Sequence, residues 1–366
     1  MPRLLARFAL GAPALALLGA AALLDVDWWT RHVVVPACYL PPPPWMLPAV
    51  RIALAAAGVA LAVTAARVPR PTAAGAARVA LAVVLALAAS ELALRLLERD
   101  ERRTHHPRLE FLLGAPDART GWSFVPHSTL RFGAPGGGPV VDYATDAHGD
   151  RAPSPDFTED TQAPTLVIAG ESIALGHGLA WKDTFAALAG ARLGLQVINV
   201  AEGGYGSDQT LLRVRDALRR LQRPVALVST VVPVQLHRNL NDARPHLELR
   251  EGALVLAPAF SPRLRLRELI ADELQVLPEW RLQKSLRLTR AILEATVREA
   301  RQRGARPLLV APVFGREPQL LRELLDGLPH VTVELPPERI MPWDGHPDAQ
   351  GARLVAEAIV QYFSSP

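Results

Sequence analysis

The amino-acid sequence predicts an α/β domain, a three-layer doubly wound parallel sheet, that follows N-terminal transmembrane helices. The first hundred residues hold three long apolar runs, whereas charged residues become frequent from Glu98 onward. After residue 164 the pattern changes to short apolar strands that alternate with helices. Because strands that alternate with helices form a parallel sheet covered on both faces, we expect a membrane part followed by an α/β part.

The apolar runs are residues 8–24, 46–66 and 77–97. A helix of about 20 apolar residues crosses about 30 Å of hydrocarbon, so we expect residues 1–100 to form a membrane anchor of about three transmembrane helices. The alternative for the first run is a cleaved signal peptide, with the small residues Gly19, Ala20 and Ala21 near its end. Polar residues inside the runs have simple explanations: Arg51 lies near a helix end, and Glu91 and Arg95 are four residues apart on one helix face.

The distribution of arginine predicts the orientation of the anchor. By the positive-inside rule, the N-terminus and the loop between the second and third runs are cytoplasmic, so the chain after residue 97 lies outside the cytoplasmic (inner) membrane, in the periplasm. The basic residues that carry this assignment are Arg3, Arg7, Arg67, Arg70 and Arg78. Three arginines just past the third run count against it: Arg102, Arg103 and Arg108.

Composition argues against several classes of function. The net charge of +4 comes from scattered arginines without interleaved aromatic residues, so we expect no nucleic-acid partner. Cys38 is the single cysteine, which rules out an intrachain disulfide and a cysteine-based metal site. The spacing of histidines and carboxylates does not resemble a zinc site, and we expect neither a metal nor a cofactor.

The chain after the anchor divides into two parts. Residues 101–163 are rich in glycine and proline, with extended pieces at 122–124 and 140–143, and predict a linker or small β-containing collar. Residues 164–366 carry the α/β pattern. Its predicted strands are residues 165–169, 197–200, 225–232, 307–311 and 331–333, and its predicted helices are residues 184–193, 208–221, 285–302, 318–325 and 348–362.

Polar residues follow the first two of these strands. Gly170-Glu171-Ser172 follows residues 165–169, where glycine permits a tight turn and places the serine hydroxyl at the start of a helix. A serine in this position is more often a helix N-cap. The second strand leads into a glycine cluster at residues 203–206, whose backbone N–H groups can approach an oxyanion. The alternatives are a phosphate-binding turn or a plain loop, but the cluster lacks the spacing of a dinucleotide site.

The third polar segment is Asp344-Gly345-His346-Pro347, directly before the last helix. A histidine with an acid two residues earlier can accept the proton of a serine while the carboxylate orients the ring. A helix-capping turn is the alternative. Because the carboxyl ends of parallel strands meet at one edge of a sheet, the three segments together predict a site formed by Ser172, His346 and Asp344.

The three segments resemble the first, second and fifth sequence blocks of the SGNH (GDSL-type) hydrolases, here in a membrane-anchored bacterial form. The resemblance covers residues 165–363. It implies a doubly wound α/β sandwich and the activity of an esterase, lipase, carbohydrate O-deacetylase or acyltransferase. By position it implies that Ser172 is the nucleophile, that its N–H and that of Gly204 are oxyanion donors, that His346 is the general base and that Asp344 orients it.

Three positions depart from the family pattern. Glu171 replaces the usual aspartate of the first block, and one residue instead of two separates Asp344 from His346. After the third strand, Gln235 stands where the family has the asparagine that supplies the third oxyanion donor. A glutamine retains the NH₂ donor on a longer stem, so Gln235 is our first candidate. The alternatives are His237, Asn239 and Asn241, or a site without this donor.

The resemblance and the apolar runs together predict a membrane-tethered serine hydrolase that acts on O-acetyl or other short acyl esters of cell-envelope or exported carbohydrate, or on a small ester. Lipid esters are disfavoured because the sequence shows no amphipathic lid. Two alternatives stay open. One is an O-acyltransferase that works with a membrane-embedded export or acyl-transfer partner, and the other is a non-catalytic domain that binds glycans or scaffolds a complex.

Overall fold

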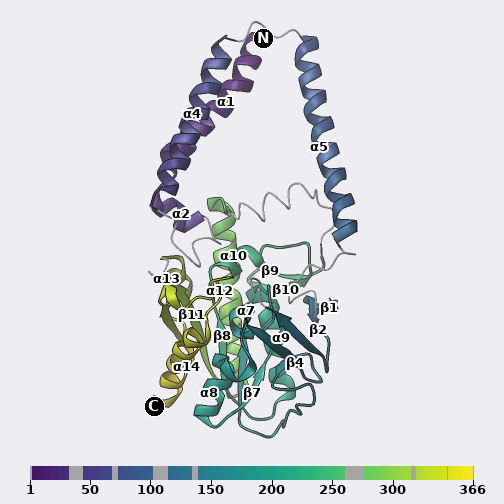
Figure 1. The fold of residues 1–366 in the computed structure, drawn as a ribbon, viewed down its shortest axis with the longest axis vertical. Coiled ribbons are helices and arrows are strands. Elements are labelled where there is room, and N and C mark those ends of the chain that lie inside the picture. Colours follow the sequence, from purple (N-terminus) through teal and green to yellow (C-terminus); the bar gives the residue numbers. More distant parts are fainter. Residues whose placement is uncertain are drawn as a thin grey trace. The chain divides into compact units, whose positions relative to one another are not determined.

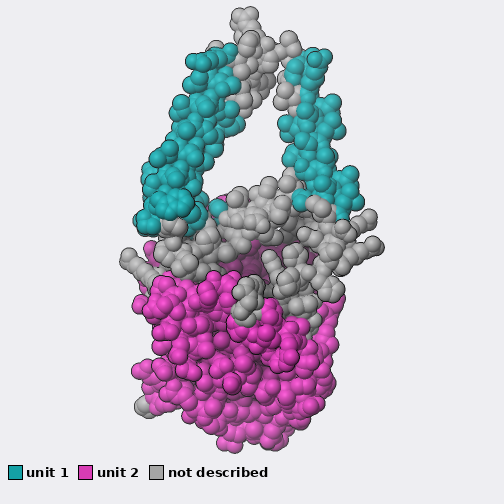
Figure 2. All heavy atoms as spheres, viewed as in Figure 1, with its two compact units in different colours: residues 1–37, 41–105, 262–276 teal, residues 38–40, 106–261, 277–366 magenta. Residues whose placement is uncertain are grey.

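The computed structural model describes residues 2–32, 44–67, 73–101, 114–133, 139–259, 276–314, 319–343 and 345–365. The chain forms two compact units (Figure 2). Unit 1 comprises residues 1–37, 41–105 and 262–276, and unit 2 comprises residues 38–40, 106–261 and 277–366. Each unit is a separate body with its own packing.

Unit 1 is helical, with α1 (Pro2–Leu23), α2 (Val26–His32), α4 (Met46–Arg67) and α5 (Ala73–Glu101). Helices α1 and α4 pack along each other (Figure 1). Gly58 permits this approach, because a Cβ there would lie 2.9 Å from the Leu18 side chain. Arg51 donates to the Ala21 carbonyl at 2.9 Å, which satisfies a polar group in an apolar helix.

The predicted apolar runs are all helical. Residues Met46–Thr64 of α4 form a helix long and apolar enough to cross a membrane, and Ala12–Leu23 of α1 is a shorter apolar helix. The expected pair on α5 is confirmed, since Arg95 donates to Glu91 at 2.7 Å. The number of membrane crossings and their orientation stay predictions.

Unit 2 is built on an 8-stranded sheet in the order β12-β11-β8-β6-β7-β5-β4-β3. Its first five strands are parallel and confirm the predicted α/β fold. They are β6 (Thr165–Ala169), β7 (Gln196–Asn199), β8 (Pro224–Thr230), β11 (Arg306–Phe314) and β12 (His330–Leu335). In chain order this arrangement is 2-1-3-4-5, so the topological switch point lies between β6 and β8, where α/β proteins bind their ligands.

Helices cover both faces of the parallel strands. Helices α8 (Phe185–Leu193) and α14 (Ala349–Ser364) pack together, while α9 (Ser207–Arg220) packs against α12 (Glu279–Gln302), which also contacts α13 (Gln319–Leu325). Right-handed crossovers place α8 and α14 on one face of the sheet and α9, α12 and α13 on the other. The short elements α7 (Ser172–Leu175), α10 (Val234–Arg238), η2 (Trp181–Asp183) and η3 (Pro337–Arg339) lie in the connections.

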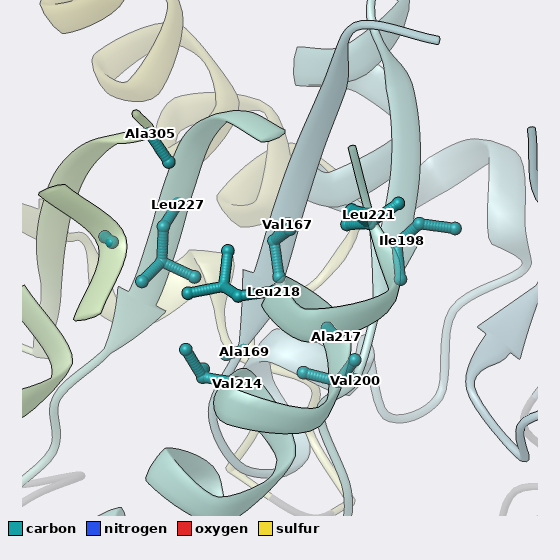
Figure 3. Close-up of a cluster of buried hydrophobic side chains, with 11 residues drawn as sticks. Val167, Ala169, Ile198, Val200, Val214, Ala217, Leu218, Leu221, Leu227 and Ala305 are labelled. Atoms are coloured by element: carbon teal, nitrogen blue, oxygen red, sulfur yellow. The ribbon is translucent and has the colours of Figure 1, made fainter. Parts of the chain in front are cut away.

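The core between the sheet and α9 is apolar and closely packed (Figure 3). Side chains from the three central strands point at the helix: Val167, Ala169, Ile198 and Leu227 contact Val214, Ala217 and Leu218. Each is at most 2% exposed. Burial of this kind contributes about 25 cal/mol per Å² of apolar area, so it fixes the strands whose ends carry the site.

The sheet is mixed and extends into the segment expected to be a linker or collar. Strands β3 (Thr129–Gly133), β4 (Val140–Thr145) and β5 (Arg151–Ala152) pair antiparallel with one another, and β5 pairs with β7. Two separate hairpins complete unit 2: β1 (Gly114–Asp117) with β2 (Gly121–Phe124), and β9 (His246–Arg250) with β10 (Ala253–Ala257). The predicted extended pieces at 122–124 and 140–143 therefore lie in β2 and β4.

The junction between the antiparallel strands and α9 holds a buried charge cluster. The Asp150 carboxylate is 1% exposed and pairs with Arg213 at 2.6 Å and with Arg220. Arg220 also donates to Glu159 at 2.8 Å. Removal of one partner from a buried pair leaves an uncompensated charge, which is strongly destabilising.

We therefore expect Asp150→Asn to lower the free energy of unfolding by about 3 kcal/mol, measured by urea denaturation of the full chain in detergent. Asp142→Asn is the matched control, because its ion pair with Arg131 is 67% exposed on the aspartate side. An exposed pair is screened by water, so the control variant should unfold like the wild type. An equal loss of unfolding free energy in the two variants would contradict the expectation that the buried Asp150 pairs contribute more than the exposed Asp142 pair.

Candidate active site

Ser172 lies where β6 ends and α7 begins, at the switch point of the sheet. Gly170 has φ +143°, and a Cβ there would lie 1.9 Å from Thr230 Oγ1 on β8, so glycine is required for the turn. Glu171 caps α7 by accepting from the Ile173 N–H at 3.0 Å. The turn and cap together place the Ser172 side chain above the carboxyl ends of the strands, 6% exposed.

The Ser172 hydroxyl lies between two polar side chains and donates to one of them, Glu171. His346 Nε2 is 2.7 Å from Ser172 Oγ, and Glu171 Oε2 is 2.8 Å from the same atom. Glu171 is fully buried and its other oxygen accepts from Thr230 Oγ1 at 3.3 Å. The structure thus brings together two of the predicted site residues, Ser172 and His346, and adds Glu171 as a contact that the sequence did not predict.

His346 is held by the loop that joins β12 to α14. The Met341 N–H donates to the His346 carbonyl at 2.7 Å, and the Asp348 N–H donates to the Arg339 carbonyl at 2.8 Å. Asp348 then caps α14 through the Gly351 N–H at 2.7 Å. Helix α14 packs against α8, and the histidine before it lies beside Ser172, which follows β6. The predicted orienting acid, Asp344, lies outside the described residues.

A turn at residues 176–179 packs against both members of the pair. The His177 N–H donates to the Ser172 carbonyl at 2.9 Å. The His177 ring stacks on the His346 ring with centroids 4.6 Å apart and an interplanar angle of 36°. Phe132 and Trp343 complete an aromatic cluster around His177, at 5.5 and 5.9 Å.

The glycine loop after β7 carries Gly204, which has φ +75°. The β1–β2 hairpin holds this loop: the Tyr205 hydroxyl donates to the Trp122 carbonyl at 2.6 Å, and Gln209 Nε2 donates to the Thr120 carbonyl at 2.6 Å. On the other side, Asp208 forms two bonds of 2.8 Å with Arg244. The predicted oxyanion segment is therefore fixed from two directions, as a preorganised donor requires.

Glu202 is a buried acid at the base of the same loop. Its Oε1 accepts from the Phe124 N–H of the β1–β2 hairpin at 2.9 Å, and the residue is 1% exposed. Burial raises the pKa of Glu202 from its ordinary 4.5 to about 8, against the opposing attraction of Arg213. The Glu202 carboxyl therefore holds its proton to a higher pH than an ordinary glutamate does.

The Gln235 amide is engaged with the end of β8. Its Oε1 accepts from the Val232 N–H at 3.2 Å, and its Nε2 lies 3.5 Å from the Thr230 carbonyl oxygen. Among the alternatives, Asn239 is buried and donates to Thr289 Oγ1 at 2.8 Å, while Asn241 accepts from the Ala243 N–H at 3.0 Å. The Gln235 donor role stays a prediction.

Among the residues that the structure describes, no group of three or more His, Cys, Asp or Glu side chains is placed to hold a metal ion.

Three further residues of the site escaped sequence reasoning. The only sequence signal for the contact of Glu171 with Ser172 is that the two residues are adjacent. The only signal for His177 as a site residue is its position between two glycines, five residues after the serine. Arg151, which is 2% exposed and donates to the carbonyl oxygens of Gly176 and Leu179, has no signal in the sequence. Its contacts arise from long-range strand pairing.

No protein-family model matches the chain, and no curated protein matches it in sequence. Among solved structures, 31 chains match in fold. One is a putative lipolytic protein of the G-D-S-L family from Desulfitobacterium hafniense, with 13% identity, a TM-score of 0.35, and 54% of this chain and 99% of that chain covered.

Two other matches carry different descriptions. One is a carbohydrate esterase family 2 enzyme with a carbohydrate-binding domain from Corynascus thermopiles, with 16% identity, a TM-score of 0.32, and 59% of this chain and 70% of that one covered. The other is a salicylyl-acyltransferase from a tetracycline biosynthetic pathway, with 16% identity, a TM-score of 0.33 and 57% of each chain covered. Likeness at these identities concerns the fold alone and assigns no residue a role.

The raised pKa of Glu202 makes stability depend on pH. In the unfolded chain the carboxyl ionises near its ordinary pKa of 4.5, but in the folded protein it holds its proton up to about 8. The folded state thus binds more protons between these values, and this contribution to stability is lost as the pH rises through the folded pKa. A glutamine at this position cannot ionise.

We expect Glu202→Gln to raise the urea midpoint relative to the wild type at about pH 9 more than at about pH 5. The measurement is the difference between the two unfolding curves across this range, with the full chain in detergent. Parallel pH profiles for the two proteins would show that Glu202 is already ionised in the folded state.

Proposed function

We propose that unit 2 is an ester hydrolase in which Ser172 is the nucleophile and His346 the general base. The observation that carries the proposal is the 2.7 Å contact between Ser172 Oγ and His346 Nε2 above the carboxyl ends of the parallel strands. Nucleophile and base within hydrogen-bond reach, in the crevice at a switch point, is the arrangement that acyl transfer needs.

The reaction follows from this geometry. His346 Nε2 accepts the Ser172 proton as Oγ bonds to the ester carbonyl carbon, and the carbonyl oxygen becomes an oxyanion. The C–O bond to the alcohol then breaks, and His346 returns the proton to the departing oxygen, which leaves an acyl-enzyme. Water attacks this ester with His346 again as base, and the acid leaves as Ser172 regains its proton. In this proposal Asp344 orients the imidazole.

The oxyanion would be bound by the N–H groups of Ser172 and Gly204 and by the Gln235 amide. Support for Gly204 comes from its left-handed backbone and from the hydrogen bonds that hold its loop on both sides. A fixed donor acts without reorganisation at the moment of reaction, which makes such groups large contributors to rate.

The described surroundings of His346 leave little space, which disfavours a bulky acyl group. A cavity of about 10 Å³ lies beside the histidine, with the apolar residues Ile173, Leu179, Phe185 and Val355 in its lining. A space of this size admits one water-sized group. We therefore propose acetyl or another short acyl group, carried on a cell-envelope or exported carbohydrate or on a small ester, with α4 in the membrane and unit 2 in the periplasm.

The direct test is covalent labelling of the full chain in detergent. We expect a fluorophosphonate probe to label the wild type and p-nitrophenyl acetate to be hydrolysed, and both activities to fall to background in Ser172→Ala. Absence of Ser172-dependent labelling together with absence of turnover in the wild type would favour a glycan-binding or scaffolding role, and turnover that persists in Ser172→Ala would assign the nucleophile to another residue. Faster transfer of acetyl to an oligosaccharide than release of acetate would instead favour an O-acyltransferase.

Gln235→Glu tests the third donor, because glutamate keeps the oxygen that accepts from Val232 but loses the NH₂ group. Loss of an oxyanion donor lowers kcat by about 10² to 10³, and we expect a decrease of this size with little change in KM. Asn241→Asp is the matched comparison, because it also keeps its acceptor oxygen. A lowered kcat in Asn241→Asp with an unchanged kcat in Gln235→Glu would assign the donor role to Asn241. An unchanged kcat in both variants would show that neither residue is the donor.

A further inference from the structure

The antiparallel strands β3–β5 reach into the site through two buried side chains, Tyr143 on β4 and Arg151 on β5. Tyr143 is 1% exposed and Arg151 2%. The Arg151 guanidinium lies over the Tyr143 ring, 4.0 Å from its centroid. Burial of an arginine costs free energy, and here it lowers the pKa of Arg151 to about 10.

The described part of the chain offers Arg151 no carboxylate within ion-pair distance, and besides Tyr143 it contacts backbone carbonyl groups. One guanidinium nitrogen donates to the Gly176 carbonyl at 3.1 Å and another to the Leu179 carbonyl at 2.6 Å. The planar fork of arginine suits two acceptors at fixed separation, which the single ammonium of lysine does not match. The Tyr143 hydroxyl accepts from the Gly178 N–H at 2.5 Å.

These three hydrogen bonds hold one short turn, residues 176–179. The turn is tightly constrained on its other side, because a Cβ on Gly178 would lie 2.7 Å from Met341 Sδ and 2.9 Å from Trp343. Its remaining residue, His177, contacts both members of the proposed pair. The His177 N–H donates to the Ser172 carbonyl at 2.9 Å, and the His177 ring stacks on His346.

We propose that Tyr143 and Arg151 are positioning residues that act through His177 to hold Ser172 and His346 at hydrogen-bonding distance. This inference rests on the proposed hydrolase function and assigns a part in it to strands outside the parallel sheet. The turn is bound to β4 and β5 on one side and contacts Ser172 and His346 on the other. A small displacement of the turn therefore misaligns the Ser172–His346 contact.

The test measures kcat and KM for p-nitrophenyl acetate, and the rate of fluorophosphonate labelling of Ser172, in the full chain in detergent. Tyr143→Phe removes the acceptor for Gly178 but keeps the ring beneath Arg151, and Arg151→Lys keeps the charge but not the fork. Misplacement of reacting groups lowers rate steeply, so we expect kcat and labelling rate to fall about tenfold in each with KM nearly unchanged. Arg131→Lys, on the exposed side of β3, should behave like the wild type.

A second set of variants tests the role of His177. His177→Ala removes the stacked ring and should lower kcat about tenfold, whereas His177→Phe keeps an aromatic ring against His346 and should restore most of the rate. The double variant Tyr143→Phe with His177→Ala should be no slower than His177→Ala alone, because residues that act in series have non-additive effects. Melting temperatures recorded for all variants separate loss of fold from loss of alignment.

Several outcomes would overturn the inference. They are variants that label and turn over at wild-type rates, variants that lose only thermal stability, and additive effects in the double variant. If the wild type is active and any of these results is found, the positioning role is refuted and the hydrolase proposal stands. A wild type without Ser172-dependent labelling or turnover refutes the hydrolase proposal, and the inference fails with it.

Discussion

The hydrogen bond between Ser172 Oγ and His346 Nε2 joins two segments that are 174 residues apart. It forms because Ser172 directly follows the turn at the carboxyl end of β6 and because the loop between β12 and α14 is held by its own backbone hydrogen bonds with His346 beside the serine. The apolar core beneath α9 fixes the strands, and the required glycine at position 170 fixes the turn to the serine. The proposed chemistry needs this short contact, and the rest of unit 2 maintains it.

Many of the groups that hold the loops of the proposed site in place are polar and buried. The loop with Gly204 is held by the β1–β2 hairpin through Tyr205 and Gln209, and by the Asp208–Arg244 pair. The turn with His177 is held by β4 and β5. Buried polar groups are costly unless each finds a partner, so networks of this kind specify one arrangement of the loops. The segment before the parallel strands is therefore part of the site's framework.

The parallel half of the fold was predictable from the sequence, since strand β6 begins and ends where the apolar pattern does. The meeting of Ser172 and His346 followed from a general property of parallel sheets. The antiparallel extension was not predictable, because β5 has two residues and pairs with distant segments. For the same reason the burial of Arg151 gave no local signal. The Gln235 side chain lies in α10, and its bonds to the backbone of residues 230–232 depend on the local turn, which the sequence pattern does not predict.

The central claim is that Ser172 carries the acyl group during turnover, and peptide mapping by mass spectrometry tests it most directly. The full chain, quenched with acid during hydrolysis of an aryl acetate, is digested and its peptides are mapped for acetylation. We expect acetyl on the peptide that contains Ser172, and its loss after prolonged incubation without substrate. Turnover that leaves Ser172 unmodified while another side chain carries the acetyl group would rule out Ser172 as the nucleophile.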